Sequence, residues 1–149
     1  MNDRIEKNLL LKARPSRVWR AISDAQEFGT WFNVKLDGAF AAGKTIRGHI
    51  TNPGWEHLAV EMQIERIEPE HYLSYRWHPY AADPKVDYSQ EPTTLVEFKL
   101  EEATGGTMLT VIESGFDKIP AGRRDEAFRM NDGGWAIQVK NIERHVAGS

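Results

Sequence analysis

The stretch Glu113-Ser114-Gly115-Phe116 closes a run of alternating sequence, and the residues that follow it read as one long helix. From Pro120 to about Val146, apolar residues recur at helical spacing and charged residues lie largely elsewhere. Such a helix would be roughly 40 Å long at ~1.5 Å per residue, so it needs a broad surface to lie across. The preceding strands supply that surface. The sequence therefore predicts a curved sheet wrapped around a helix, with space for a ligand between them.

Those strands are predicted from period-two alternation of apolar and polar side chains. The alternating segments are residues 45–50, 60–65, 73–78, 95–100 and 109–111. A looser alternation over residues 5–12 predicts a first strand. Clean alternation means that one side of each strand is covered and the other is wet, which is typical of antiparallel sheets.

Two short helices are expected after the first strand. Pro15 sits where a helix can begin, and Ser23-Asp24 offers an N-cap for a second helix that runs to about Gly29. Trp31-Phe32 follows with bulk that must pack against something. Residues 79–92 hold three prolines and several polar residues, so we expect a long loop. That loop either rims the mouth of a pocket or is a surface insertion.

Length and composition suit one soluble domain spanning residues 1–149. The net charge is −3 with both signs interspersed, so neither nucleic acid nor anionic lipid is an expected partner. The absence of cysteine excludes disulfides, thiolate zinc sites and iron–sulfur ligation. The first residues lack the apolar core of a signal peptide, and no segment approaches ~18 apolar residues. We therefore expect a cytoplasmic protein without membrane insertion.

A series of short motifs, each present once, extends along nearly the whole chain. They are Pro15-Ser16-Arg17-Val18-Trp19-Arg20-Ala21, Trp31-Phe32, Glu68-Pro69, Leu73-Ser74-Tyr75-Arg76-Trp77, Thr94-Leu95-Val96-Glu97-Phe98, Gly106-Thr107-Met108-Leu109-Thr110, Glu113-Ser114-Gly115-Phe116 and Asn131-Asp132-Gly133-Gly134-Trp135. With these motifs the sequence resembles the START-like, or SRPBCC (Bet v-like), superfamily. Within it, the sequence is most similar to homologues of the heat-shock chaperone ATPase activator, of its C-terminal-domain type.

The resemblance implies an α+β helix-grip fold: a curved antiparallel sheet wrapped around a long C-terminal helix, with two short helices after the first strand. It also implies a cavity, which members of the superfamily use for lipids, hormones, polyketides and other ligands.

Glu113 is the first candidate for chemistry. It continues the parity of Leu109 and Val111, so its carboxylate is expected on the covered face of the sheet, where desolvation raises its pKa. Such a group can anchor a ligand hydroxyl or amine, or act as a general acid or base, with Tyr75 as a second catalytic candidate. In the alternative, Glu113 reaches solvent at the end of the strand or pairs with an arginine, and its role is structural.

Aromatic side chains are expected to line the cavity. Tyr75 and Trp77 share the inward parity of their strand, and Asn131 lies one turn before Trp135 on the helix. The predicted ligand-binding residues are Tyr75, Trp77, Phe98, Glu113, Phe128, Asn131 and Trp135. The alternative is a packed core with no void, because parity does not separate the two.

Two pairs of residues in the long helix are unfavourable where they stand. Gly133-Gly134 in its middle is costly, which suggests a close approach to the sheet, room for a ligand, or a kink. Arg123-Arg124 at its start oppose the helix dipole, so they are read as a solvated face or as a contact for an acidic partner.

No metal or other cofactor is expected. His49 and His78 lie on outward positions and His71 lies beside a turn, and neither metal-ligand spacing nor a phosphate-binding motif occurs.

Three functions are compatible with the sequence. The first is binding of a small hydrophobic or amphipathic molecule between sheet and helix. The second is an enzyme, of cyclase, dehydratase or hydrolase type, acting on an aromatic or polyketide-like substrate. The third is a chaperone-associated module that binds another protein.

Overall fold

The computed structural model describes residues 3–83 and 85–147, and in that part of the chain one curved antiparallel sheet packs against helices. The sheet has seven strands in the order β1-β7-β6-β5-β4-β3-β2. The strands are β1 (Arg4–Leu11), β2 (Val34–Leu36), β3 (Thr45–Ile50), β4 (Ala59–Glu68), β5 (Tyr72–Trp77), β6 (Thr94–Ala103) and β7 (Gly106–Ser114). The helices are α1 (Pro15–Ser23), α2 (Ala25–Phe32), the 3-10 turn η1 (Phe116–Lys118) and α3 (Ala121–Val146).

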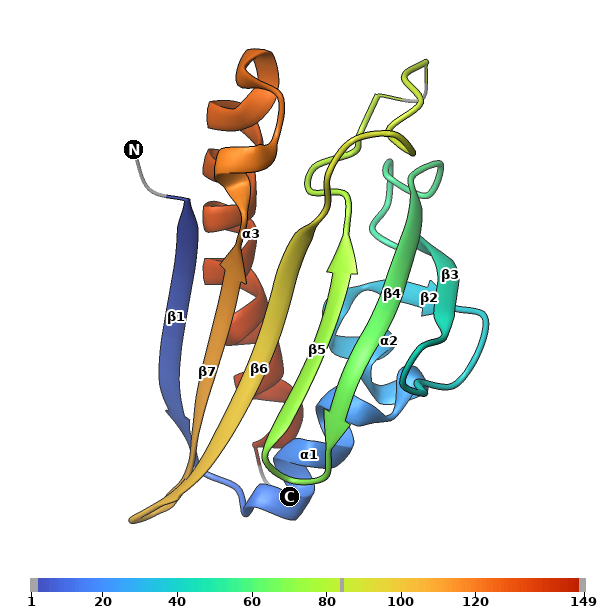
Figure 1. The fold of residues 1–149 in the computed structure, drawn as a ribbon. Coiled ribbons are helices and arrows are strands. Elements are labelled where there is room, and N and C mark those ends of the chain that lie inside the picture. Colours follow the sequence, from blue (N-terminus) through green and yellow to red (C-terminus); the bar gives the residue numbers. More distant parts are fainter. Residues whose placement is uncertain (1–2, 84, 148–149) are drawn as a thin grey trace.

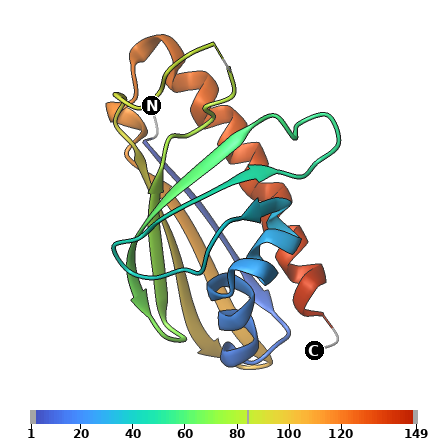
Figure 2. The same cartoon turned by 90° about the vertical axis from the view of Figure 1, so that its right-hand side faces the viewer.

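Figure 1 shows α3 running along one face of the sheet, with α1 and α2 beside its C-terminal end. Turned by 90°, the β3–β4 hairpin (green) runs across the view to α3, so the sheet curves around the helix (Figure 2). The predicted helix-grip architecture, with its long final helix and two short helices after the first strand, is therefore confirmed. None of the helices in the described part of the chain combines the length and apolar character that crossing a bilayer requires.

Capping residues set the two ends of α2. Oδ1 of Asp24 accepts hydrogen bonds from the backbone N–H groups of Gln26 (2.9 Å) and Glu27 (3.0 Å), which confirms the predicted N-cap. The helix does not end near Gly29, as the sequence predicts, but continues to Phe32. Asn33 then ends it in a left-handed conformation with φ of 65°. The extra turn carries Trp31 and Phe32 into the interior.

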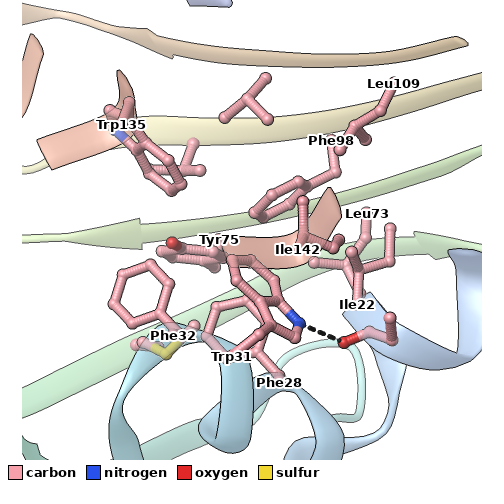
Figure 3. Packing of buried hydrophobic residues seen from close by; sticks show 14 of the residues in the cluster. Ile22, Phe28, Trp31, Phe32, Leu73, Tyr75, Phe98, Leu109, Trp135 and Ile142 are labelled. Atoms are coloured by element: carbon pink, nitrogen blue, oxygen red, sulfur yellow. Dashed lines mark hydrogen bonds between the residues drawn. The ribbon is translucent and has the colours of Figure 1, made fainter. Parts of the chain in front are cut away.

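Those two aromatic residues fill much of the space between sheet and helix (Figure 3). Phe28 of α2 packs edge-on against Phe98 of β6, with ring centroids 6.2 Å apart. Phe32 packs against Trp135 of α3 at 5.8 Å. Nε1 of Trp31 is satisfied by the backbone oxygen of Ala21 at 2.8 Å. The middle of the molecule is therefore a packed aromatic core.

Candidate ligand pocket

A pocket of about 450 Å³ lies at the end of the sheet away from the short helices, between the β3–β4 hairpin, the segment after β5 and one edge of α3. Its lining is mainly apolar. The lining residues are Arg47, Gly48, Ile50, Asn52, Trp55, Leu58, Ala59, Val60, Glu61, Trp77, His78, Tyr80, Ala81, Ala82, Met130 and Asn131. Pockets that bury small molecules have volumes of roughly 300–1,000 Å³ and similar composition.

Glu113, at the end of β7, lies directly behind this pocket and has no exposed surface, as its parity predicts. Oε1 accepts hydrogen bonds from Nε1 of Trp135 (2.8 Å) and Nδ2 of Asn131 (3.0 Å). Oε2 accepts from Nε1 of Trp77 (2.8 Å), Oγ1 of Thr94 (2.5 Å) and Nδ2 of Asn131 (3.1 Å). The carboxylate thus joins β5, β6 and α3.

The partners of Glu113 are all neutral. Within the ranges that the structure describes, no lysine, arginine or histidine forms an ion pair with it, which excludes the predicted alternative of an arginine partner. Burial raises the pKa of Glu113 above its ordinary 4.5, and the hydrogen bonds from Thr94, Trp77, Trp135 and Asn131 oppose that shift. A buried carboxylate is retained here by hydrogen bonds instead of by an opposite charge.

Two predicted site residues, Trp77 and Asn131, line the pocket. Both also donate to Glu113, so they form a wall with the pocket on one side and the buried carboxylate on the other. Oδ1 of Asn131 makes no hydrogen bond within the described residues. The wall therefore consists of an amide side chain and an indole ring.

The other predicted residues lie deeper or elsewhere. Phe98 and Trp135 pack in the aromatic core, with ring centroids 5.9 Å apart. Tyr75 is also fully buried there, 5.3 Å from the ring of Trp77. Phe128 is separate from this group, because its ring packs against Phe116 at 5.2 Å.

Tyr75 does not form a catalytic pair with Glu113. Its hydroxyl has no hydrogen-bond partner among the described residues. Burial, and then the charge of Glu113, raise the pKa of Tyr75 well above its ordinary range. A phenol held in this way keeps its proton, and the ring lies in the core and not in the pocket lining.

The loop after β5 contributes to the pocket, since Tyr80, Ala81 and Ala82 line it. Of the predicted loop 79–92, the residues near its start border the pocket, as expected of a loop that rims a pocket mouth. A surface insertion alone would not line the pocket. Sequence reasoning missed Trp55, Leu58 and Met130. The available signal in the sequence was a lone tryptophan, Trp55, in the polar segment between β3 and β4.

Arg123 fixes this loop from the first turn of α3. Its guanidinium donates to Oε1 of Glu91 (2.9 and 2.7 Å) and to the backbone oxygens of Pro79 (3.0 Å) and Tyr80 (3.2 Å). It also lies 4.7 Å from the centre of the Tyr88 ring. The two predicted roles for Arg123, a solvated face and a contact for an acidic partner, are therefore wrong: its partners are within the chain.

A metal centre is not indicated by the geometry. Over residues 3–83 and 85–147, no group of three or more histidine, cysteine, aspartate or glutamate side chains could hold an ion.

Residues 12–147 match the family described as "Activator of Hsp90 ATPase homolog 1-like protein". No curated protein matches the chain. Among solved structures, protein MLL2253 from Mesorhizobium loti is 23% identical, with a TM-score of 0.76 over 96% of both chains. The Aha1 dimer from Colwellia psychrerythraea is 16% identical, with a TM-score of 0.72 over 96% of this chain and 95% of that chain.

DynU16, a protein of the dynemicin biosynthetic locus, is 21% identical with a TM-score of 0.76. That match covers 99% of this chain and 48% of DynU16, so the chain spans about half the length of that protein. At these identities the likeness shows a common fold.

Proposed function

The chain belongs to the family of Activator of Hsp90 ATPase homolog 1-like proteins, and from that premise we propose that it binds a small hydrophobic or amphipathic molecule in the pocket beside α3. The observation that carries this proposal is the wall made by Trp77 and Asn131. That wall is held in place by a buried carboxylate, so its geometry is set before any ligand arrives. Pre-organisation of this kind reduces the entropy lost on binding.

The composition of the pocket supports an amphipathic ligand. Aliphatic side chains such as Ile50, Leu58 and Val60 line it together with the aromatic Trp55 and Trp77. Polar atoms are few, as is usual in sites that bind small molecules, where a small number of polar groups sets the orientation. An apolar body with one polar group matches such a lining.

Binding fits the placement of Glu113 better than catalysis does. The enzyme alternative depends on Glu113 and Tyr75 acting on a molecule in the pocket. Neither residue lines the pocket, and four protein side chains already donate hydrogen bonds to the carboxylate of Glu113. A general acid or base has to reach the reacting atom within about 3 Å or through one water.

Binding of a fluorescent probe tests the proposal. N-phenyl-1-naphthylamine brightens in apolar surroundings, so its fluorescence reports binding to the protein. The variant Ala82→Trp fills the pocket and is expected to weaken probe binding at least ~10-fold, equivalent to ~1.4 kcal/mol. The matched control is Ala136→Trp, at an exposed position of α3 outside the pocket. Equal probe affinity in the wild type and Ala82→Trp would contradict the proposal.

A further inference from the structure

We propose that the outward face of α3 pairs with the same face of a second copy of this chain, with the two helices antiparallel. The outward face is defined by Met130, Gly133, Gly134 and Ile137. Met130 is 44% exposed and Ile137 is 64% exposed. They are two of five large apolar residues that are exposed among the described residues. Apolar residues grouped on a surface mark contacts with other molecules, whereas isolated ones need no explanation.

The spacing of these residues places them along one line of the helix, on the side away from the core. Gly134 follows Met130 by four residues and Ile137 follows Gly134 by three, the spacing at which residues of a helix are neighbours. The buried residues of α3, among them Trp135, face the sheet instead. A Cβ built on Gly133 or Gly134 would have no atom within 4 Å beyond the adjoining backbone of the helix. The described part of the chain therefore leaves the centre of the outward face open.

The two glycines suit the approach of a second helix. Glycine inside a helix is destabilising relative to alanine, and neither Gly133 nor Gly134 has a positive φ that would require it. Packing within the described residues does not require it either. The axes of two packed helices lie roughly 8–10 Å apart, and they lie closest where the residues in contact are small. The outward face is therefore shaped for contact with another helix.

The outward face is symmetric about its centre, which selects a second copy as the occupant. Met130 precedes Gly133 by three residues, and Ile137 follows Gly134 by three. A twofold axis between the two glycines reverses the direction of the helix. It brings Met130 of each copy against Ile137 of the other. Such an isologous contact, in which both copies use the same surface, is the commonest arrangement of homodimers.

Charged residues beside the outward face complement each other in the same arrangement. Glu126, Lys140 and Arg144 are exposed. They lie along one flank of the face, because Lys140 follows Glu126 by 14 residues and Arg144 follows it by 18, close to four and five turns of ~3.6 residues. About the twofold axis, Glu126 of one copy lies opposite position 141 of the other, between its Lys140 and Arg144. A parallel pair would instead place Glu126 beside Glu126 of the other copy.

The pairing is expected to be reversible. A contact along one helix is smaller than a standard interface of about 1,200–2,000 Å², and small interfaces are typical of transient association. Met130 also lines the ligand pocket, so a second copy on the outward face borders that pocket. The pairing itself requires no ligand.

Sedimentation velocity measures the pairing. At low ionic strength the wild-type protein should pass from monomer to dimer between about 1 µM and about 500 µM, since small interfaces are weak. Ile137→Glu should raise the dissociation constant at least ~10-fold. The control is Leu10→Glu, which changes another exposed apolar residue, on β1. A wild type that stays monomeric over this range, or a dimer that Leu10→Glu weakens as much as Ile137→Glu does, would overturn the proposal.

An exchange of charges tests the antiparallel arrangement. Glu126→Lys and the double variant Lys140→Glu/Arg144→Glu should each dimerise at least ~10-fold more weakly than the wild type, because each places like charges together. An equimolar mixture of the two variants should regain the lost affinity, since the reversed charges then attract across the interface. Glu101→Lys, at an exposed position of β6, is the control for net charge. A mixture that associates no more tightly than its components would overturn the antiparallel pairing.

Discussion

Nε1 of Trp135 lies 2.8 Å from Oε1 of Glu113, and this hydrogen bond ties the middle of α3 to the end of β7. The other carboxylate oxygen accepts a hydrogen bond from Trp77 of β5 at 2.8 Å. One side chain therefore holds the helix to two strands, at the level where the packed core gives way to the pocket. The position of the pocket and the stability of the fold depend on the same carboxylate.

Replacement of that carboxylate should destabilise the protein. In Glu113→Gln one oxygen becomes a donor, so at least one of the indole N–H groups loses its acceptor in a buried site. An unsatisfied buried donor costs about 2 kcal/mol, and we expect the free energy of unfolding to fall by about that amount. Denaturant unfolding measures it, with Glu101→Gln as the exposed control. A loss no larger than that of the control would show that the network contributes nothing.

The effect of Glu113→Gln on the free energy of unfolding should depend on pH. Burial raises the pKa of Glu113 above 4.5, so the folded protein holds this proton more tightly than the unfolded chain does. The stability from Glu113 is then fully present below about pH 4.5 and is lost as the pH rises through the folded pKa. The stability of the wild type relative to Glu113→Gln should therefore fall as the pH rises above about 4.5. If the difference in the free energy of unfolding between the two proteins grew with pH, folding would lower the pKa of Glu113 instead of raising it.

Periodicity in the sequence predicted the direction of side chains well. The alternation that places Glu113 on the covered face holds in β7, where Leu109, Val111 and Glu113 are all buried. The boundaries of α3 also agree with the sequence to within one residue. Strand β2 was not predicted, because its three residues are too few to show an alternating pattern.

The site was harder to predict, because periodicity says which way a side chain points and not which distant element fills the space it points into. Tyr75 and Phe98 do point inward, but α2 continues past Gly29, and its Trp31 packs against Phe98 with ring centroids 6.5 Å apart. The void is displaced toward the β3–β4 hairpin, where a lone exposed Trp55 carries no periodic signal. Long-range contacts of this kind are visible only in the folded chain.

Replacement by alanine should have opposite effects on stability at two helix glycines, Gly133 and Gly29. A Cβ added to Gly133 of α3 would have no atom within 4 Å, so close packing does not require that glycine. Gly133→Ala should raise the free energy of unfolding by roughly 0.5–1 kcal/mol through helix propensity. In α2, a Cβ on Gly29 would lie 2.3 Å from the backbone oxygen of Val34, and Gly29→Ala should destabilise the protein. Thermal unfolding of the two variants checks the pair, and shifts in the same direction would contradict it.

A second carboxylate should give the reverse pH dependence. Burial alone would raise the pKa of Glu27, but hydrogen bonds from His145, Arg17 and Arg20 and the charge of Arg17 lower it overall. Its stability contribution is therefore present above about pH 4.5 and is lost as the pH falls through the folded pKa. The advantage of the wild type over Glu27→Gln should shrink on acidification.

Unfolding at several pH values tests this expectation, with Glu143→Gln at an exposed position of α3 as the control. Because His145 lies near the C-terminal end of α3 and Glu27 lies in α2, the same experiment measures how firmly the two helices are joined. An advantage independent of pH would mean that the ion pairs are too exposed to matter.

Removal of Arg123 should loosen the loop that borders the pocket. Its guanidinium holds the two ends of the loop together, through the backbone oxygen of Pro79 at 3.0 Å and the carboxylate of Glu91 at 2.7 Å. In Arg123→Ala we expect amide hydrogen exchange in residues 79–83 and 85–91 to accelerate at least ~10-fold, because local opening then costs less. Arg129→Ala, at an exposed position of the same helix, is the control. Arg123→Lys should restore little of the protection, since an ammonium cannot reproduce the planar set of contacts. Unchanged exchange in Arg123→Ala would mean that the loop is held by its own packing, and that the mouth of the pocket does not depend on α3.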